Sequence, residues 1–202
     1  QGPDNTHNEG TLVLRAFAAV TKTLSLGTSM AICHRHPIHL AQLFAGLNEI
    51  SSGRVIMGMG LGGFPHEFAA AGYPTRIEER ADLVRSNVEI CRRLWTGERL
   101  SYKNDYFDFT DVALKPTPVG PIPIWYGGGT PAACRRAVEY WDGWMPARIT
   151  LATFAKLVVY VRELCKKAGK PMLSAAVMPF TSVGRDRETA LRGVNIESLI
   201  AE

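Results

Sequence analysis

The chain has 202 residues, of which 46% are hydrophobic and 21% charged, so it can bury a sizeable core in one large domain or two small ones. Its net charge of +4 is spread along apparent helix faces, which argues against a nucleic-acid surface. The apolar runs stay shorter than the about 18 residues of a membrane span, and residues 1–10 lack the apolar region of a signal peptide, so we expect neither a membrane segment nor an export signal.

The first half of the chain alternates between predicted helices and strands. Apolar spacing predicts helices over 12–21 and 37–50, with strands over 24–30 and 55–59. The clearest helix covers 80–95, where apolar residues form a wide face suited to packing against a sheet.

The second half begins with short aromatic and proline-rich pieces over 96–121, which we interpret as an excursion and not as a domain. Strands then follow at 122–126, around Trp144 and at 173–183, with helices at 132–140 and 154–165 between them. Strands that alternate with helices predict parallel βα units in a single α/β domain over 1–202, either a barrel or a doubly wound sheet. Both architectures bind ligands at the carboxyl ends of their strands, where the glycines of this chain collect.

The most informative segment is IPIWYGGGTP at 122–131, in which an apolar strand leads through Gly127, Gly128 and Gly129 to a helix start. Thr130 is suited to cap that helix, and Pro131 is preset for its first turn. The exposed N–H groups of such a turn favour a phosphate. The alternative is a glycine-rich turn that only links strand to helix.

A second glycine loop follows the strand 55–59. Gly58, Gly60 and Gly63 match G-x-G-x-x-G, the dinucleotide-binding pattern. That pattern needs a helix that starts within the glycines, whereas Phe64-Pro65 follow here, so we disfavour a Rossmann site. His66, just after this loop, is our candidate catalytic residue for proton transfer or for contact with a bound ring system; the alternative is a surface or capping role.

Cysteines and histidines give no clear metal or disulfide pattern. The four cysteines lie far apart without a C-x-x-C pair, which predicts reduced thiols and a cytoplasmic protein. The one cluster with metal-ligating residue types consists of Cys33, His34, His36 and His39, but its spacing is not diagnostic. Pro37 at a helix start explains part of it, so we expect no metal.

The order of these motifs resembles the luciferase-like monooxygenase family of flavin- or deazaflavin-dependent oxidoreductases. The resemblance covers most of the chain, and its order and spacing are specific. Its main segments are LGTSM at 26–30, RHP at 35–37, SSGRVIMGMGLGG at 51–63, PIPIWYGG at 121–128 and DGW at 142–144.

The resemblance implies a TIM-type (β/α)8 barrel, a choice that spacing alone leaves open. It also implies that Gly127, Gly128, Gly129 and Thr130 hold the phosphate of FMN or of the deazaflavin coenzyme F420.

By the same resemblance, Gly60, Gly62 and Gly63 lie with His66 beside the ring system of that cofactor. In relatives the strand that matches 24–30 often ends in a bulge with a non-prolyl cis peptide against the ring. Carried over, this bond is Ser29-Met30, with Ala31 and Ile32 beside it.

The implied activity is that of an oxidoreductase acting on a small organic substrate. Reduced flavin would activate oxygen, as in a monooxygenase, or a deazaflavin would exchange hydride with the substrate. The spacing over 60–68 resembles the deazaflavin-using branch slightly more.

The chain also departs from the family, because only about five of the eight βα units are recognisable. N-terminal strands 1 and 2 and the C-terminal strand have no counterpart. Such a barrel exposes two sheet edges and an open interior, so we expect a partial chain or a partner that covers the gap, and a homo-oligomer such as a dimer. The alternative function is a non-catalytic or degenerate flavin-binding protein.

Overall fold

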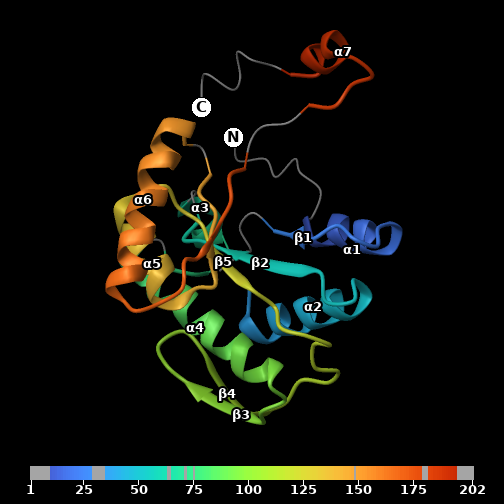
Figure 1. The fold of residues 1–202 in the computed structure, drawn as a ribbon. Helices are drawn as coiled ribbons and strands as arrows, with labels where there is room; N and C mark the ends of the chain where they lie inside the picture. Colours follow the sequence, from blue (N-terminus) through green and yellow to red (C-terminus); the bar gives the residue numbers. More distant parts are fainter. Residues whose placement is uncertain are drawn as a thin grey trace.

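The computed structural model describes residues 10–28, 35–62, 65–70, 72–74, 76–147, 149–178 and 182–194. Apart from the consecutive helices α3 and α4 and the added hairpin β3–β4, helices and strands alternate along these ranges, as predicted (Figure 1). In chain order the elements are α1 (Gly10–Val20), β1 (Leu26–Gly27), α2 (Pro37–Ile50), β2 (Val55–Met59), α3 (Pro65–Ala70), α4 (Ile77–Trp95), β3 (Leu100–Lys103), β4 (Asp108–Val112), β5 (Ile124–Tyr126), α5 (Pro131–Tyr140), β6 (Gly143–Trp144), α6 (Leu151–Lys167), β7 (Ser174–Ala175) and α7 (Arg187–Arg192).

Five strands form one parallel sheet in the order β1-β2-β5-β6-β7. The register pairs Met57 with Ile124 and Trp125 with Gly143. A doubly wound sheet reverses its strand order at a switch point, whereas this order follows the chain throughout. The sheet is therefore a curled half-barrel, and the strand order favours the barrel over the doubly wound alternative.

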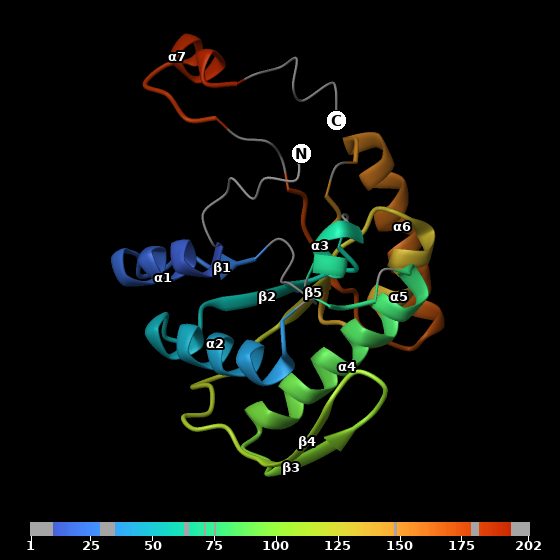
Figure 2. The ribbon, with the colours of Figure 1, turned by 180° about the vertical axis from the view of Figure 1, so that it is seen from behind.

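The two faces of this sheet carry different side chains, because successive residues of a strand point to opposite sides. Tyr126 and Trp144 share one face, where Trp144 stacks on Phe154 of α6 with a centroid separation of 5.4 Å. Helices α2, α4, α5 and α6 lie around this outer face (Figures 1 and 2). Trp125 lies on the opposite face, which we call the inner face.

The helix α4 packs on α2 and supplies much of the core. Its buried residues form one wide face of the helix: Arg80, Leu83, Val84, Ser86, Asn87, Val88, Ile90, Cys91 and Leu94. It begins at Ile77 and not at Arg80, with Glu78 and Glu79 in the first turn. Acidic residues there are favourable because they complement the helix dipole.

The hairpin β3–β4 lies between α4 and β5 in the chain and forms its own antiparallel sheet. Leu100 and Phe107 of this segment are buried in the core. The segment 96–121 therefore adds packing to the domain but adds no strand to the parallel sheet.

Several predicted boundaries differ from the structure. The helix α3 was not predicted, because six residues carry too few apolar positions to show a helical period. The strand expected over 173–183 contributes only Ser174–Ala175 to the sheet, and the strand expected over 24–30 contributes Leu26–Gly27 within the described residues. Among those residues β1 and β7 each pair on one side only, so fewer ladder hydrogen bonds fix their length.

The helix α1 exposes apolar side chains, with Leu12 61%, Phe17 49% and Val20 79% accessible. The helix contacts the edge strand β1. Within the described ranges, no helix is both long enough and apolar enough to cross a membrane.

Candidate functional site

The carboxyl ends of β1, β2 and β5 meet at one edge of the sheet. The Thr28 hydroxyl oxygen accepts a hydrogen bond from the Gly58 N–H, with 3.1 Å between nitrogen and oxygen. The Gly127 N–H donates to the Met59 carbonyl at 2.7 Å. The loops that follow β2 and β5 therefore start side by side, with Gly60 next in the chain to the Met59 carbonyl that Gly127 binds.

The loop 127–130 is the candidate anion site. Thr130 caps α5, as predicted, because its hydroxyl accepts the Ala133 N–H at 3.2 Å, and Pro131 occupies the first turn. Among the described residues, the N–H groups of Gly128 and Gly129 find no hydrogen-bond acceptor. They lie at a helix N-terminus, where an anion is stabilised by the helix dipole.

Gly128 cannot be replaced without strain. Its φ is +125°, and a Cβ at this position would lie 2.7 Å from the Cβ of Ala133. The indole N–H of Trp144 fixes the loop from the outer face by donating to the Gly128 carbonyl at 2.9 Å. The loop shape is thus determined by packing and by one side-chain hydrogen bond as well as by the glycines.

The loop after β2 is held from beneath by Arg80, whose role the sequence analysis missed. Its guanidinium donates to the carbonyls of Leu61 at 2.9 Å and Gly62 at 3.1 Å, and it lies 4.8 Å from the ring centroid of Phe68. Arg80 is 3% exposed, and its Nε atom has no hydrogen-bond partner within the described part of the chain. The sequence feature that could have revealed this role is the position of Arg80 three residues before Leu83, on the apolar face of the helix.

The same packing explains Gly62. Its φ is +72°, and a side chain there would overlap the Phe68 ring. Gly62 therefore allows the loop to lie directly on Phe68, with Arg80 between the loop and α4.

The inner face of the sheet carries one aromatic side chain between two glycines. The register aligns Gly58, Trp125 and Gly143 in one row across three strands. A Cβ on Gly143 would lie 2.6 Å from the Trp125 indole, so the ring lies over that glycine. Gly58 and Gly143 are buried, so the exposed part of this row is the half-buried Trp125 ring, a flat apolar surface suited to contact with a planar ligand.

Some predicted site residues lie outside the described residues. These are Ser29, Met30, Ala31, Ile32 and Gly63, and the predicted Ser29-Met30 peptide bond is among them. The backbone of His66 lies in α3, and the structure does not describe its side chain.

The histidine cluster has a local structural role at α2. The His36 Nδ1 accepts the Ile38 N–H at 3.3 Å and so caps the helix. Burial, and next the charge of His39, lower the pKa of His36. Cys33 and His34 lie outside the described residues. Cys91, Cys134 and Cys165 are buried free thiols, and burial raises the pKa of Cys91.

Comparison with known proteins gives a consistent result. A family model described as luciferase-like monooxygenase matches residues 2–201. The chain is 31% identical over 185 residues to an F420-dependent glucose-6-phosphate dehydrogenase of Amycolatopsis mediterranei, covering 87% of this chain and 55% of that protein. It is 32% identical over 183 residues to an F420-dependent hydroxymycolic acid dehydrogenase of Mycobacterium tuberculosis, covering 89% and 51%.

A solved structure with a similar fold is the coenzyme F420-dependent tetrahydromethanopterin reductase of Methanopyrus kandleri. It superposes with a TM-score of 0.79 at 24% identity, over 96% of this chain and 61% of that one. The chain thus spans about half the length of the curated relatives it matches.

Proposed function

Because the chain belongs to the luciferase-like monooxygenase family, we propose that it is part of an oxidoreductase that binds a deazaflavin of the F420 type at the carboxyl ends of β1, β2 and β5. The observation that carries the proposal is the pair of N–H groups of Gly128 and Gly129 at the start of α5, which bond to no described residue. Both relatives named above are F420-dependent, which favours a deazaflavin over FMN.

The loop 127–130 is the proposed phosphate site. Its N–H groups and the α5 dipole supply positive charge, and the first turn of α5 has no acidic side chain to repel a phosphate. A side chain on Gly128 would collide with Ala133, so replacing this glycine would change the shape of the proposed phosphate loop.

The ring system would lie between the two glycine loops. Gly60, Gly62 and Gly63 would border it on one side, and Ser29–Ile32 would support it from β1, as the family resemblance implies. Trp125 on the inner face would form an apolar wall that excludes water from the ring or from the substrate.

A deazaflavin, when bound, supplies a hydride acceptor or donor, whereas reduced FMN supplies electrons to oxygen. The residues of the chain would bind, orient and shield the reacting groups. His66 would hold or transfer the proton that accompanies oxidation or reduction of a small organic substrate. Arg80 would fix the position of Leu61 and Gly62 beneath the ring.

The complete barrel would contain eight βα units, of which this chain supplies about five. We propose that the two N-terminal strands and the last strand of the barrel come from outside the described ranges, and that the protein forms a homodimer. Three buried free thiols support a reducing compartment such as the cytoplasm.

The second candidate is a flavin-binding protein without activity of its own. It is favoured by the one-sided pairing of β1 and β7 among the described strands, which leaves the parallel sheet open at both edges there. In that case the phosphate site would persist without a complete substrate pocket.

Titration of the chain with F420, FMN and a phosphate-free deazaflavin tests the proposal. We expect F420 to bind at least tenfold more tightly than the phosphate-free compound, because only F420 can use the loop 127–130. In Gly128→Val this difference should shrink below threefold, while Gly120→Ala should keep it, since no atom lies within 4 Å of a Cβ on Gly120. Equal affinity of wild type for both deazaflavins would refute the phosphate assignment. Coenzyme binding without turnover of any substrate would favour the second candidate.

A further inference from the structure

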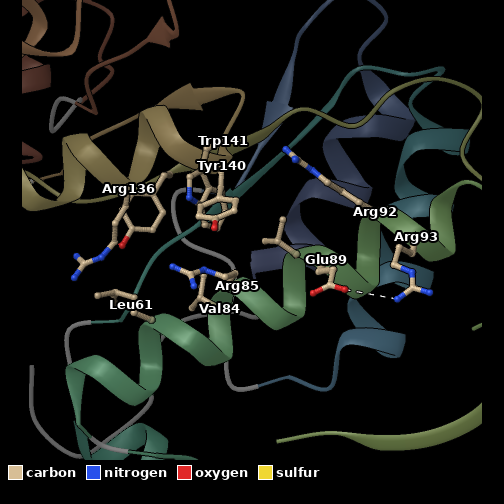
Figure 3. Close-up of a pocket in the computed structure, with 12 residues that line it drawn as sticks. Leu61, Val84, Arg85, Glu89, Arg92, Arg93, Arg136, Tyr140 and Trp141 are labelled. Carbon is tan, nitrogen blue, oxygen red and sulfur yellow. Dashed lines mark ion pairs between the residues drawn. The ribbon is translucent and has the colours of Figure 1, made fainter. Parts of the chain in front are cut away.

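A separate cavity of about 430 Å³ lies on the outer face of the sheet, between α4 and α5 (Figure 3). We call it the outer groove. Its floor contains Tyr126 and Trp141, whose ring centroids are 4.8 Å apart, and Val84 and Val88 line it from α4. Tyr126 points away from the inner face, because Trp125 occupies the alternate position of the strand. The groove is therefore distinct from the proposed coenzyme site.

Arginines line this apolar floor. Two of them are neutralised: Arg92 lies 2.9 Å from an Asp142 carboxylate oxygen, and Arg93 pairs with Glu89 and Glu98. They lie toward one end of the groove, as Figure 3 shows. Because carboxylates already compensate their charge, Arg92 and Arg93 need no anionic ligand.

Arg85 and Arg136 differ from these two. Within the described part of the chain, Arg136 forms neither an ion pair nor a side-chain hydrogen bond. The nearest carboxylate oxygen to Arg85 belongs to Asp82 and is 3.9 Å away, while its guanidinium lies 4.8 Å from the Tyr140 ring centroid. Arg85 comes from α4 and Arg136 from α5, so two incompletely paired cations face the groove from its two walls.

We infer that the outer groove binds an amphipathic organic anion, a carboxylate or sulfonate on an aromatic or similarly flat apolar body. The apolar body would lie on Tyr126 and Trp141, and the anion would lie between Arg85 and Arg136. Arginine suits this task because its planar guanidinium donates two parallel hydrogen bonds to such a group. The cavity volume falls within the usual range of small-molecule sites, about 300–1,000 Å³.

Other ligand classes fit less well. A neutral apolar ligand would leave both cations unpaired, and a small inorganic anion would leave the aromatic floor exposed to water. An amphipathic anion satisfies both parts of the lining at once. Its binding requires no coenzyme and no substrate of the proposed reaction.

The probe for the test is 8-anilinonaphthalene-1-sulfonate, followed by its fluorescence and by the quenching of tryptophan. In the double variant Arg85→Gln/Arg136→Gln its Kd should rise at least tenfold. The matched control is Arg135→Gln, which removes the same charge from α5 but at an exposed guanidinium that donates to the Tyr160 hydroxyl at 3.1 Å. That control should change the Kd less than twofold. Equal Kd values for wild type and double variant, or equal losses in the control, would overturn the inference.

A second variant tests the cavity without changing charge. Ala81 lines the groove from α4, so Ala81→Phe should fill it and weaken the probe at least tenfold. The neutral analogue N-phenyl-1-naphthylamine should bind wild type and the arginine double variant with the same Kd, since it has no anion to place. Retention of probe affinity in Ala81→Phe would overturn the assignment of the site, and a parallel loss of the neutral analogue in the double variant would overturn the role of charge.

Discussion

Replacing Gly128 by alanine should destabilise the chain strongly. A side chain at φ +125° is in a conformation that L residues rarely adopt, which costs about 1–3 kcal/mol. The new Cβ would also lie 2.7 Å from that of Ala133, about 1 Å inside normal contact, and such overpacking costs about 1–3 kcal/mol. We therefore expect the free energy of unfolding to fall by about 2–6 kcal/mol. For a chain of this length Tm should fall by at least about 4 °C.

Urea-induced unfolding, followed by circular dichroism, measures this loss. Gly120→Ala is the matched control, because a Cβ there meets nothing within 4 Å, and it should change the free energy of unfolding by less than about 0.5 kcal/mol. A Gly128→Ala protein as stable as Gly120→Ala would refute the reasoning.

The two causes of the loss can be separated. Adding Ala133→Gly to Gly128→Ala removes the Cβ–Cβ contact but leaves the positive φ. Removal of this contact should restore about 1–3 kcal/mol of the lost free energy of unfolding. Ala133→Gly alone should lower the free energy of unfolding by about 1 kcal/mol, because glycine has a lower helix propensity than alanine. A double variant without any recovery relative to the sum of the single variants would show that the steric contact contributes nothing.

Three further predictions concern Arg80, His36 and the thiols. Arg80→Met should speed amide hydrogen exchange over 60–62 by about ten- to a hundredfold, because two charged hydrogen bonds are lost, and an unchanged rate would contradict the role of Arg80. The pKa of His36 is lowered in the folded chain, so below the ordinary histidine pKa of 6.5 the unfolded chain binds more protons than the folded chain. The contribution of His36 to the free energy of unfolding should therefore be full above pH 6.5 and fall as the pH drops below it. His36→Gln should flatten this part of a urea-unfolding profile measured between pH 7.5 and 5, and an unchanged profile would contradict the linkage. Burial raises the pKa of Cys91 and of Cys134, so at pH 8 both should react with a thiol reagent only after denaturation; fast labelling in the native state, mapped by mass spectrometry, would contradict their burial.

Local pattern predicted much of this fold. The helix over 37–50 and the strand over 55–59 coincide with α2 and β2, because their apolar spacing and their flanking Pro37 and Gly53 act within the segment itself. The Thr130 cap and Pro131 at the start of α5 were also readable, since capping depends on residues only three apart.

Features that depend on distant contacts were not readable. Arg80 is polar, and its burial follows from carbonyls and a ring that the fold brings to it. The hydrogen bond from Trp144 to Gly128 joins two strand ends whose neighbourhood exists only in the sheet. The outer groove lies between α4 and α5, which are distant in the sequence, and Tyr126 of the sheet forms part of its floor. No periodicity in either helix encodes that separation.

Leu61 belongs to both regions of the molecule. Its side chain borders the outer groove, and its carbonyl accepts the hydrogen bond of Arg80 that holds the loop after β2. Any occupant of the groove that displaces Leu61 must therefore change the energy of that loop. Thermodynamic linkage makes such an effect reciprocal: a ligand that alters affinity at one region by a given factor has its own affinity altered by the same factor from the other. A single residue thus gives the outer groove and the loop at the carboxyl end of β2 a route to heterotropic coupling.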